Sequence, residues 1–240
     1  MKKFLRESKL SKSKGFSLLE LAIVLVIVGL LISAFLAPLS AQRDLRDYSD
    51  AKAHLEQIRD ALYGYAIING RLPCSTTTVG PLNDVNYGHE DATCPLTAAA
   101  GVLPWKDLGV TEVDSWNNPR ILSTDPWTGY WVYRVDPVFT STFTLTTTPT
   151  GNIDVKKADG TSQTIAAERA VAVVCTTGKN KVADGENATY ENTPVPVINP
   201  LPPTNPVYQD DAQSPTFDDM CIWITRPSLF NHMVSAGKLP

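Results

Sequence analysis

The 240-residue sequence has few of the residues that usually do chemistry in a protein. Its three histidines and four cysteines are scattered, and no Cys-x-x-Cys pair, HExxH helix, phosphate-binding loop or nucleophile elbow is present. These absences argue against a zinc ribbon, a thioredoxin-like site and a catalytic constellation. The sequence therefore predicts a protein that is not an enzyme and that has no organic cofactor.

Positive charge is scarce outside the first fifteen residues. Residues 1–15 contain six basic side chains against the single acid Glu7, whereas the whole chain has a net charge of −4. The rest of the chain is therefore acidic. An acidic body argues against nucleic acid as a partner of the folded part.

The one long apolar run lies at residues 16–37, where Glu20 is the only charge. As a helix this run would span about 33 Å, close to the hydrocarbon thickness of a bilayer. The basic residues before it predict a cytoplasmic N-terminus by the positive-inside rule. An ordinary secretory signal fits poorly, because the run is long and no convincing cleavage site follows it. A plain membrane anchor leaves Glu20 unexplained, since a carboxylate is costly in hydrocarbon.

The sequence KGFSLLE at residues 14–20 resembles the processing motif of type IV prepilins and type II secretion pseudopilins. The resemblance implies that a prepilin peptidase cleaves between Gly15 and Phe16 and that Phe16 is then N-methylated. It also implies that Glu20 meets the terminal amine of a neighbouring subunit, because two buried charges are less costly when paired. The protein would be a single-pass inner-membrane protein with a periplasmic head. An assembly platform would then add it to a filament in the periplasm or at the cell surface.

An amphipathic pattern follows the apolar run. Apolar side chains recur at spacings of three and four on an otherwise charged helix, which should end before the turn signal Asn69-Gly70. The stripe consists of Leu45, Tyr48, Ala51, Leu55, Ile58, Leu62 and Tyr65. The predicted organisation is a cleaved leader at 1–15, a transmembrane and polymerisation half-helix at 16–39, an amphipathic half-helix at 40–68 and a globular pilin head at 69–240.

The fold class is predicted to be α+β, with the long helix packed on a small antiparallel sheet as in pilins. The head would comprise a loop-rich region at 69–129, a sheet region at 130–226 and a tail at 227–240 that forms a short amphipathic helix. Strands are expected where β-branched, aromatic or alternating residues gather, at 130–135, 139–147, 170–175 and 220–225.

The four cysteines predict two disulfides, because an even count is typical of exported chains. Three pairings are open. The short interval between Cys74 and Cys94 favours a local bridge. Cys175 and Cys221 fall on two predicted strands and would be bridged if those strands are neighbours.

The interval 176–219 is rich in proline, asparagine and aspartate. Disorder is one interpretation, and a long surface loop pinned by a disulfide is the other, which we favour. Within this interval, residues 177–187 resemble the calcium-binding loop near the C-terminus of major pseudopilins. The candidate calcium ligands are Asp184, Glu186 and Asn187, joined by Asp218 or Asp219 from across the sheet. A polar turn without an ion is the alternative.

These observations predict a structural subunit, a minor pilin or pseudopilin, of a type IV pilus or a type II secretion-like filament. Other pilin subunits, the peptidase and the assembly platform would be its partners. One alternative is a filament-tip adhesin whose 176–219 interval binds a surface. The other is a membrane-tethered periplasmic protein that does not polymerise. The sequence does not choose between a motility pilus, a DNA-uptake pilus and a secretion pseudopilus.

Overall fold

The structure is a computed structural model, and its chain forms two compact units, Met1–Arg46 and Asp47–Pro240. It describes residues 17–76, 84–92, 94, 101–116, 129–165, 168–188 and 206–239, without the side chains of 34–41. The predicted cleavage site at Gly15 and Phe16 lies outside the described residues. Helix α1, Leu18–Asn69, begins in the first unit and ends in the second.

The first unit is described by its part of α1. The large apolar side chains between Leu18 and Ile32 are exposed in the single chain, with exposed fractions between 89% at Leu18 and 43% at Val28. Over the ranges that the structure describes, no helix combines the length and the apolar character needed to cross a membrane.

In the second unit, α1 presents the predicted apolar stripe to the core. Ala51, Leu55, Ile58 and Leu62 are buried, which confirms the central part of the stripe. Tyr65 is only half-buried, and Tyr63 occupies the core in its place. The helix ends at the predicted turn, where Gly70 has a φ of 71°.

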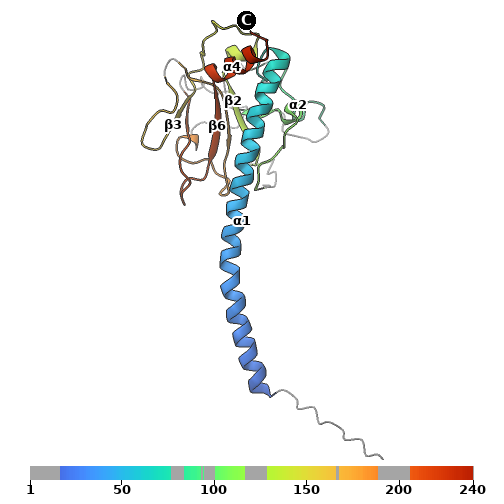
Figure 1. Ribbon diagram of the computed structural model, residues 1–240, viewed down its shortest axis with the longest axis vertical. Coiled ribbons are helices and arrows are strands. Elements are labelled where there is room, and N and C mark those ends of the chain that lie inside the picture. Colours follow the sequence, from blue (N-terminus) through green and yellow to red (C-terminus); the bar gives the residue numbers. More distant parts are fainter. Residues whose placement is uncertain are drawn as a thin grey trace, which may run out of the picture. The chain divides into compact units, whose positions relative to one another are not determined.

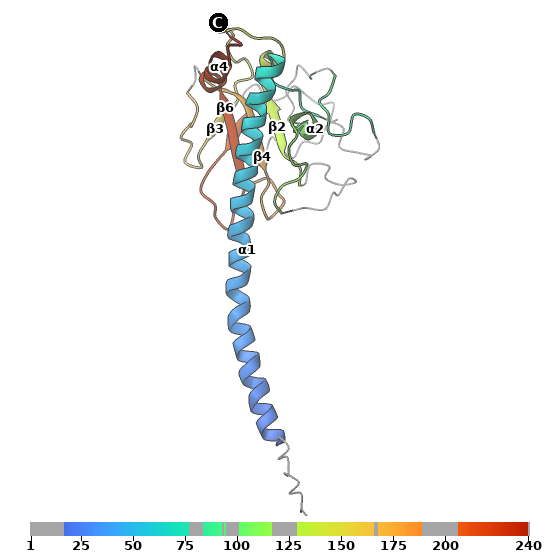
Figure 2. The same ribbon diagram turned by 45° about the vertical axis from the view of Figure 1, so that its right-hand side comes forward.

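The main sheet has four antiparallel strands in the order β1-β2-β4-β6. The strands are β1 Gly101–Val102, β2 Val132–Val135, β4 Ala170–Thr176 and β6 Met220–Thr225. All seven residues of β4 are buried, as expected of a strand with both faces covered. The C-terminal part of α1 runs across these strands in both ribbon views (Figure 1, Figure 2). The α+β prediction is thus confirmed.

Strand β4 separates two hydrophobic clusters. Ala172 and Val174 join the cluster under α1, whereas Val173 and Cys175 join a second cluster on the other face. This alternation follows from the period of two in a strand. A register shift between Ala170 and Ala172 interrupts it near the start of β4.

A second, two-stranded sheet was not predicted. It pairs β3, Asp154–Lys156, in parallel with β5, Val207–Gln209, inside the interval expected to be a loop. The sheet packs through Val155 and Tyr208 on the cluster that contains Cys175. Of the proposed pinned loop, residues 189–205 lie outside the described residues.

The strand predicted at 139–147 is wrong. The segment forms a 3₁₀ helix, η1 Pro137–Thr140, followed by a turn. Asp136 is buried and accepts hydrogen bonds from Val138 N (3.0 Å), Thr150 N (2.7 Å) and Gly151 N (2.6 Å). These bonds satisfy the backbone locally and fold the segment back on itself, so that no ladder forms.

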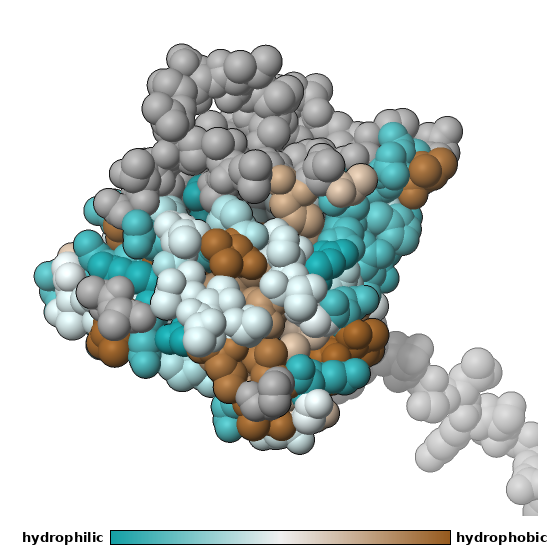
Figure 3. Space-filling view, turned by 90° about the horizontal axis from the view of Figure 1, so that it is seen from above, coloured by the Kyte–Doolittle hydropathy of each residue, from teal (hydrophilic) through white to brown (hydrophobic). Residues whose placement is uncertain are grey.

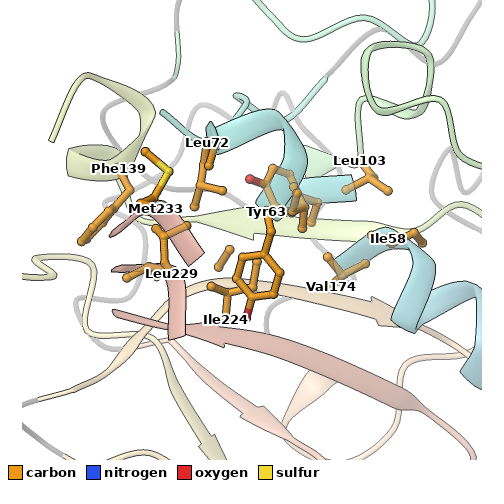
Figure 4. Close-up of a cluster of buried hydrophobic side chains, with 14 of the residues drawn as sticks. Ile58, Tyr63, Leu72, Leu103, Phe139, Val174, Ile224, Leu229 and Met233 are labelled. Atoms are coloured by element: carbon orange, nitrogen blue, oxygen red, sulfur yellow. The ribbon is translucent and has the colours of Figure 1, made fainter. Parts of the chain in front are cut away.

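The C-terminal tail forms the predicted helix, α4 Arg226–Ser235, with Leu229, Phe230 and Met233 buried. Its Leu229 and Met233 meet Tyr63 of α1 and Phe139 of η1 in one core (Figure 4). A short helix, α2 Trp105–Leu108, lies beside β1 in the sequence. Seen from above, the described surface is mostly hydrophilic or neutral, with separate apolar patches (Figure 3).

Both disulfides that the sequence favoured are present. Cys74 pairs with Cys94, with Cα atoms 5.2 Å apart. Cys175 on β4 pairs with Cys221 directly opposite on β6, with Cα atoms 4.2 Å apart.

Candidate functional site

The first turn of α1 is closed by a reciprocal pair of hydrogen bonds. Ser17 Oγ accepts from Glu20 N at 3.2 Å, and Glu20 Oε2 accepts from Ser17 N at 3.4 Å. This capping box satisfies two of the N–H groups that a helix leaves unpaired at its start. The Ser-x-x-Glu spacing that signals it was visible in the sequence, although our prediction for Glu20 concerned only a neighbouring subunit.

The cap fixes Glu20 where a negative charge is favourable. The positive end of the helix dipole lies in this first turn, and the carboxylate is exposed to solvent. The arrangement keeps the carboxylate available for a stronger partner, because its present one is a neutral backbone N–H. A protonated amine would form the shorter and stronger charge-assisted bond.

The second unit contains one group of three carboxylates that could hold a metal ion among its described residues. One ligand oxygen from each of Asp184, Asp218 and Asp219 lies within 4.8 Å of the others. Asp184 belongs to the loop after β4, and the other two immediately precede β6. The ladder pair Thr176 and Met220 places these two chain segments side by side. We call Asp184, Asp218 and Asp219 the acidic cluster.

Two members of the acidic cluster use one oxygen as an anchor and keep the other unpaired. Asp219 Oδ2 accepts from Asp184 N at 2.8 Å and from Asn187 Nδ2 at 3.0 Å, and Asp218 Oδ2 accepts from Asn180 N at 2.9 Å. Within the described part of the chain, Oδ1 of Asp218 and Oδ1 of Asp219 are buried without a hydrogen-bond partner. A buried unpaired oxygen is costly and is usually explained by a strained site, a water or an ion.

The electrostatics of the acidic cluster also favour a cation. Burial raises the pKa of Asp219 to about 7; hydrogen bonds from Asp184 N and Asn187 oppose the rise, and the charges of Asp184 and Asp218 add to it. Burial likewise raises the pKa of Asp218, with the charge of Asp184 acting in the same direction. A bound cation would lower the free energy of the ionised form of both groups.

The backbone around the cluster is closely packed. A Cβ added at Gly178 would lie 2.4 Å from the carbonyl oxygen of Asp218, so the turn after β4 rests directly on that residue. Gly178 has a φ of 65°, which suits glycine. The preceding residue, Thr177, has a buried Oγ1 with no hydrogen-bond partner in the described chain. Calcium takes carboxylate and carbonyl oxygens as ligands, so the three carboxylates of the acidic cluster fit a hard divalent cation.

Similarity to known proteins is confined to the N-terminal segment. Residues 10–36 match the prokaryotic N-terminal methylation motif, the signature of type IV pilins and pseudopilins. The chain carries the N-terminal motif of type IV pilin-like proteins. No match was found among curated proteins or among solved structures.

The fold brings some of the predicted calcium ligands together. Asp184 lies in the acidic cluster with both acids expected from across the sheet. Glu186 is exposed and is not in that group. Asn187 is fully buried, and its Oδ1 accepts from Gln209 N at 2.8 Å while its amide donates to Asp219. Asn187 therefore holds a cluster member in place.

One further buried acid lies next to the end of β4. Asp114 Oδ2 accepts from Thr176 Oγ1 at 2.9 Å, and its Oδ1 accepts from Trp116 N at 3.1 Å. Burial raises the pKa of Asp114 to about 6, and these two hydrogen bonds limit the rise. No sequence pattern signals the contact between Asp114 and Thr176, because these residues are 62 positions apart in the chain.

Proposed function

We propose that this pilin-like protein is a non-enzymatic subunit, a minor pilin or pseudopilin, of a type IV pilus or type II secretion-like filament. The methylation motif at residues 10–36 carries the proposal. Prepilin peptidase would cleave between Gly15 and Phe16 and methylate Phe16, which makes Glu20 the fifth residue of the mature chain. The capped first turn supports the proposal, because it presents the Glu20 carboxylate close to that new terminus.

Assembly would bury apolar surface that the single chain exposes. Removing a leucine or isoleucine side chain from water is worth about 1.5–3 kcal/mol, and the described part of α1 before Ala34 has many such exposed residues. In the proposed life cycle these side chains lie first in the inner membrane, with the head in the periplasm, and later among the helices of neighbouring subunits. The amine of one subunit would then replace Ser17 N as the partner of Glu20.

The test compares two variants that each remove one half of the capping box. Glu20→Ala removes the carboxylate, whereas Ser17→Ala weakens the cap and keeps the carboxylate. We expect Glu20→Ala to be cleaved normally but to be missing from sheared filaments, and Ser17→Ala to be incorporated. Incorporation of Glu20→Ala at the wild-type level would overturn the role of Glu20. An intact mass that retains residues 1–15 would overturn the prepilin assignment.

We also propose that the acidic cluster binds calcium, on the strength of the two unpaired buried oxygens. Asp184, Asp218 and Asp219 would hold the ion, which would neutralise their charge and tie the loop after β4 to the start of β6. Unfolding measured with calcium or with EDTA tests this. At a calcium concentration of 100 times Kd, the ion should add about 2.7 kcal/mol to the free energy of unfolding.

A matched pair of variants controls for a general loss of negative charge. Asp219→Asn alters the buried cluster, whereas Asp60→Asn alters an exposed acid on α1. We expect calcium to stabilise the wild type and Asp60→Asn equally and to have no effect on Asp219→Asn. Equal stabilisation of Asp219→Asn, or none of the wild type at millimolar calcium, would exclude this site.

A further inference from the structure

We propose that the Cys175–Cys221 disulfide and the acidic cluster are thermodynamically linked: the disulfide holds the cation ligands together, and the bound cation protects the disulfide from reduction. This inference rests on the calcium site proposed above. It concerns the regulation of that site, and it assigns the two disulfides of the chain different roles.

The disulfide lies at the place where the cluster is assembled. Cys175 and Cys221 are opposite each other on β4 and β6, with Cα atoms 4.2 Å apart. Only the pair Thr176 and Met220 lies beyond them in the ladder. Asp219 is then the residue next to Met220, so the disulfide is the covalent link nearest to the site.

The cluster itself acts to separate the two segments that the disulfide joins. Asp184 belongs to the segment leaving β4, whereas Asp218 and Asp219 belong to the segment entering β6. Three carboxylates this close repel one another when ionised, and the repulsion is stronger away from water. Strand ends open most easily in a native protein. Without a cation, the disulfide and the hydrogen bonds from Asp184 N and Asn180 N are left to oppose this repulsion.

A buried side chain contacts both partners of the proposed linkage. Asn187 Nδ2 lies 3.0 Å from Asp219 Oδ2 and 3.9 Å from Cys221 Sγ, and the residue has no exposed surface. A displacement of Cys221 after reduction would therefore disturb a hydrogen bond to a cation ligand. Displacement of Asp219 would in turn loosen the packing around the sulfur.

The other disulfide provides an internal control. Cys74 is two residues before Thr76, which bridges to Val102 of β1. Strand β1 is at one edge of the main sheet and β6 is at the other. The Cys74 N–H is bound by Glu90 at 2.9 Å, outside the acidic cluster. Cation binding should leave this bridge unaffected.

The linkage has a physiological consequence. Disulfides persist in oxidising compartments outside the cytoplasm. Extracellular calcium sites typically have weak affinities of about 10⁻⁴–10⁻³ M. The disulfide and the bound calcium would together stabilise this end of the sheet only in a compartment that is both oxidising and rich in calcium. The head meets such conditions only after export.

The first experiment needs no mutation. The oxidised full-length protein in detergent is treated with dithiothreitol, in enough urea for slow reduction, with calcium or with EDTA. Free thiols are alkylated over time and assigned to each cysteine pair by mass spectrometry. Couplings of this kind are typically 5- to 150-fold, so we expect calcium to slow reduction of Cys175–Cys221 about tenfold. Reduction of Cys74–Cys94 should not change.

The reciprocal experiment measures calcium affinity by calorimetry. Linkage requires that loss of the disulfide weaken calcium binding by the same factor by which calcium shifts the equilibrium of disulfide reduction, and this equality does not extend to reduction rates. The double variant Cys175→Ser/Cys221→Ser should therefore bind calcium about tenfold more weakly, and Cys74→Ser/Cys94→Ser should bind like the wild type. If the first double variant does not fold, the reduction rates of the two disulfides in the wild type decide whether the linkage holds.

The outcomes separate the linkage from the site on which it rests. If the wild type binds calcium but calcium protects both disulfides equally or protects neither, the linkage is wrong and the calcium site stands. If the wild type binds no calcium, the site fails and the linkage fails with it. Selective protection of Cys175–Cys221 that disappears in Asp219→Asn supports both.

Discussion

Asn187 and Asp219 are joined by a hydrogen bond of 3.0 Å between Nδ2 and Oδ2, inside the protein and 32 residues apart in the chain. The same amide donates to Gln209 O at 3.0 Å, and Asn187 Oδ1 accepts from Gln209 N at 2.8 Å. The side chain thus pairs with β5 as a neighbouring strand would. It fastens the small sheet to the acidic cluster.

Replacing Asn187 by alanine should destabilise the protein strongly. The change leaves the N–H and C=O of Gln209 buried without partners, and each such loss costs about 1–3 kcal/mol. We expect the free energy of unfolding in urea to fall by about 3 kcal/mol. Asn180→Ala is the control, since its side-chain hydrogen bonds are exposed and should contribute less than about 1 kcal/mol. Equal losses for the two variants would refute the role given to Asn187.

Asp114 should make stability depend on pH. Burial raises its pKa to about 6, so the folded protein binds this proton more tightly than the unfolded chain, in which the pKa is 3.8. The contribution of Asp114 to the free energy of unfolding is therefore complete below pH 3.8 and is lost as pH rises through about 6. A shift of about two units corresponds to about 3 kcal/mol.

The variant Asp114→Asn retains polar contacts to Thr176 and Trp116 and removes the titration. Relative to the wild type, it should gain up to about 3 kcal/mol at pH 7 and nothing at pH 4. Urea unfolding at a series of pH values, with saturating calcium throughout, measures the difference. A difference that does not vary with pH would show that Asp114 is not the titrating group.

Glu90 should contribute more to stability than an exposed glutamate. It accepts from Arg71 Nη1 at 2.8 Å and Nη2 at 2.6 Å, from Tyr65 OH at 2.6 Å and from Cys74 N at 2.9 Å. Burial acts to raise the pKa of Glu90, but these hydrogen bonds outweigh it and lower the pKa. The stability it contributes is therefore present above the unfolded pKa of 4.5 and is lost as pH falls.

We expect Glu90→Gln to lower the free energy of unfolding at pH 7 by about 2 kcal/mol, because hydrogen bonds to charged groups contribute about 1.5–3 kcal/mol. Glu56→Gln is the matched control. Glu56 also pairs with an arginine, Arg59, but on the exposed side of α1, where such pairs contribute less than about 1 kcal/mol. Thermal unfolding of both variants measures the contrast, and similar shifts in Tm would argue against a special role for Glu90.

Gly178→Ala should weaken calcium binding. Any Cβ here would meet the carbonyl oxygen of Asp218 at 2.4 Å and its Cγ at 2.7 Å, and would displace a proposed ligand. Gly160→Ala isolates this effect, since Gly160 also has a positive φ, 82°, but has open space around it. Both variants share the backbone strain, of about 1 kcal/mol. Calorimetry should show reduced affinity for Gly178→Ala alone, and an equal affinity for the two would place the ion elsewhere.

The elements that were predicted correctly are those whose burial leaves a pattern in the sequence. The central part of the stripe on α1, the apolar run of β4 and the buried face of the tail helix α4 match their core contacts, whereas Leu45 at the start of the stripe is 71% exposed. The sheet of β3 and β5 could not be predicted, because each strand has three residues and includes polar side chains. Asp154 of β3, for example, is held by Ser162, Thr164 and Arg169, which all lie outside the strand and at least 8 residues further along the chain.

The false strand at 139–147 has a related cause. Phe139 and Phe143 are four residues apart and are both buried, and their rings lie 5.1 Å apart. Because exposed threonines lie between these two phenylalanines, their spacing of four residues also fits the two-residue period of a strand. The hydrogen bonds that Asp136 accepts, together with those between Thr144 and Thr147, hold this segment as a compact turn and not as a strand.

The acidic cluster was predictable only in part. Asp184 was a candidate because residues 177–187 resemble the calcium-binding loop of major pseudopilins, and Asp218 or Asp219 was expected to join it from across the sheet. Which oxygens are anchored and which are unpaired depends on Asn180 and Asn187. These contacts arise from tertiary packing and leave no periodic signal in the sequence.

The capping box at the start of α1 also bears on the order of events in filament growth. In an unprocessed chain the nitrogen of Phe16 is a neutral amide, which offers Glu20 of a neighbour no advantage over its own Ser17 N–H. Only cleavage, as proposed, would create the charged amine that can outcompete this internal partner. The exchange of partners at Glu20 would then allow mature subunits to join the filament and would exclude uncleaved precursors. No additional protein would be needed to distinguish the two.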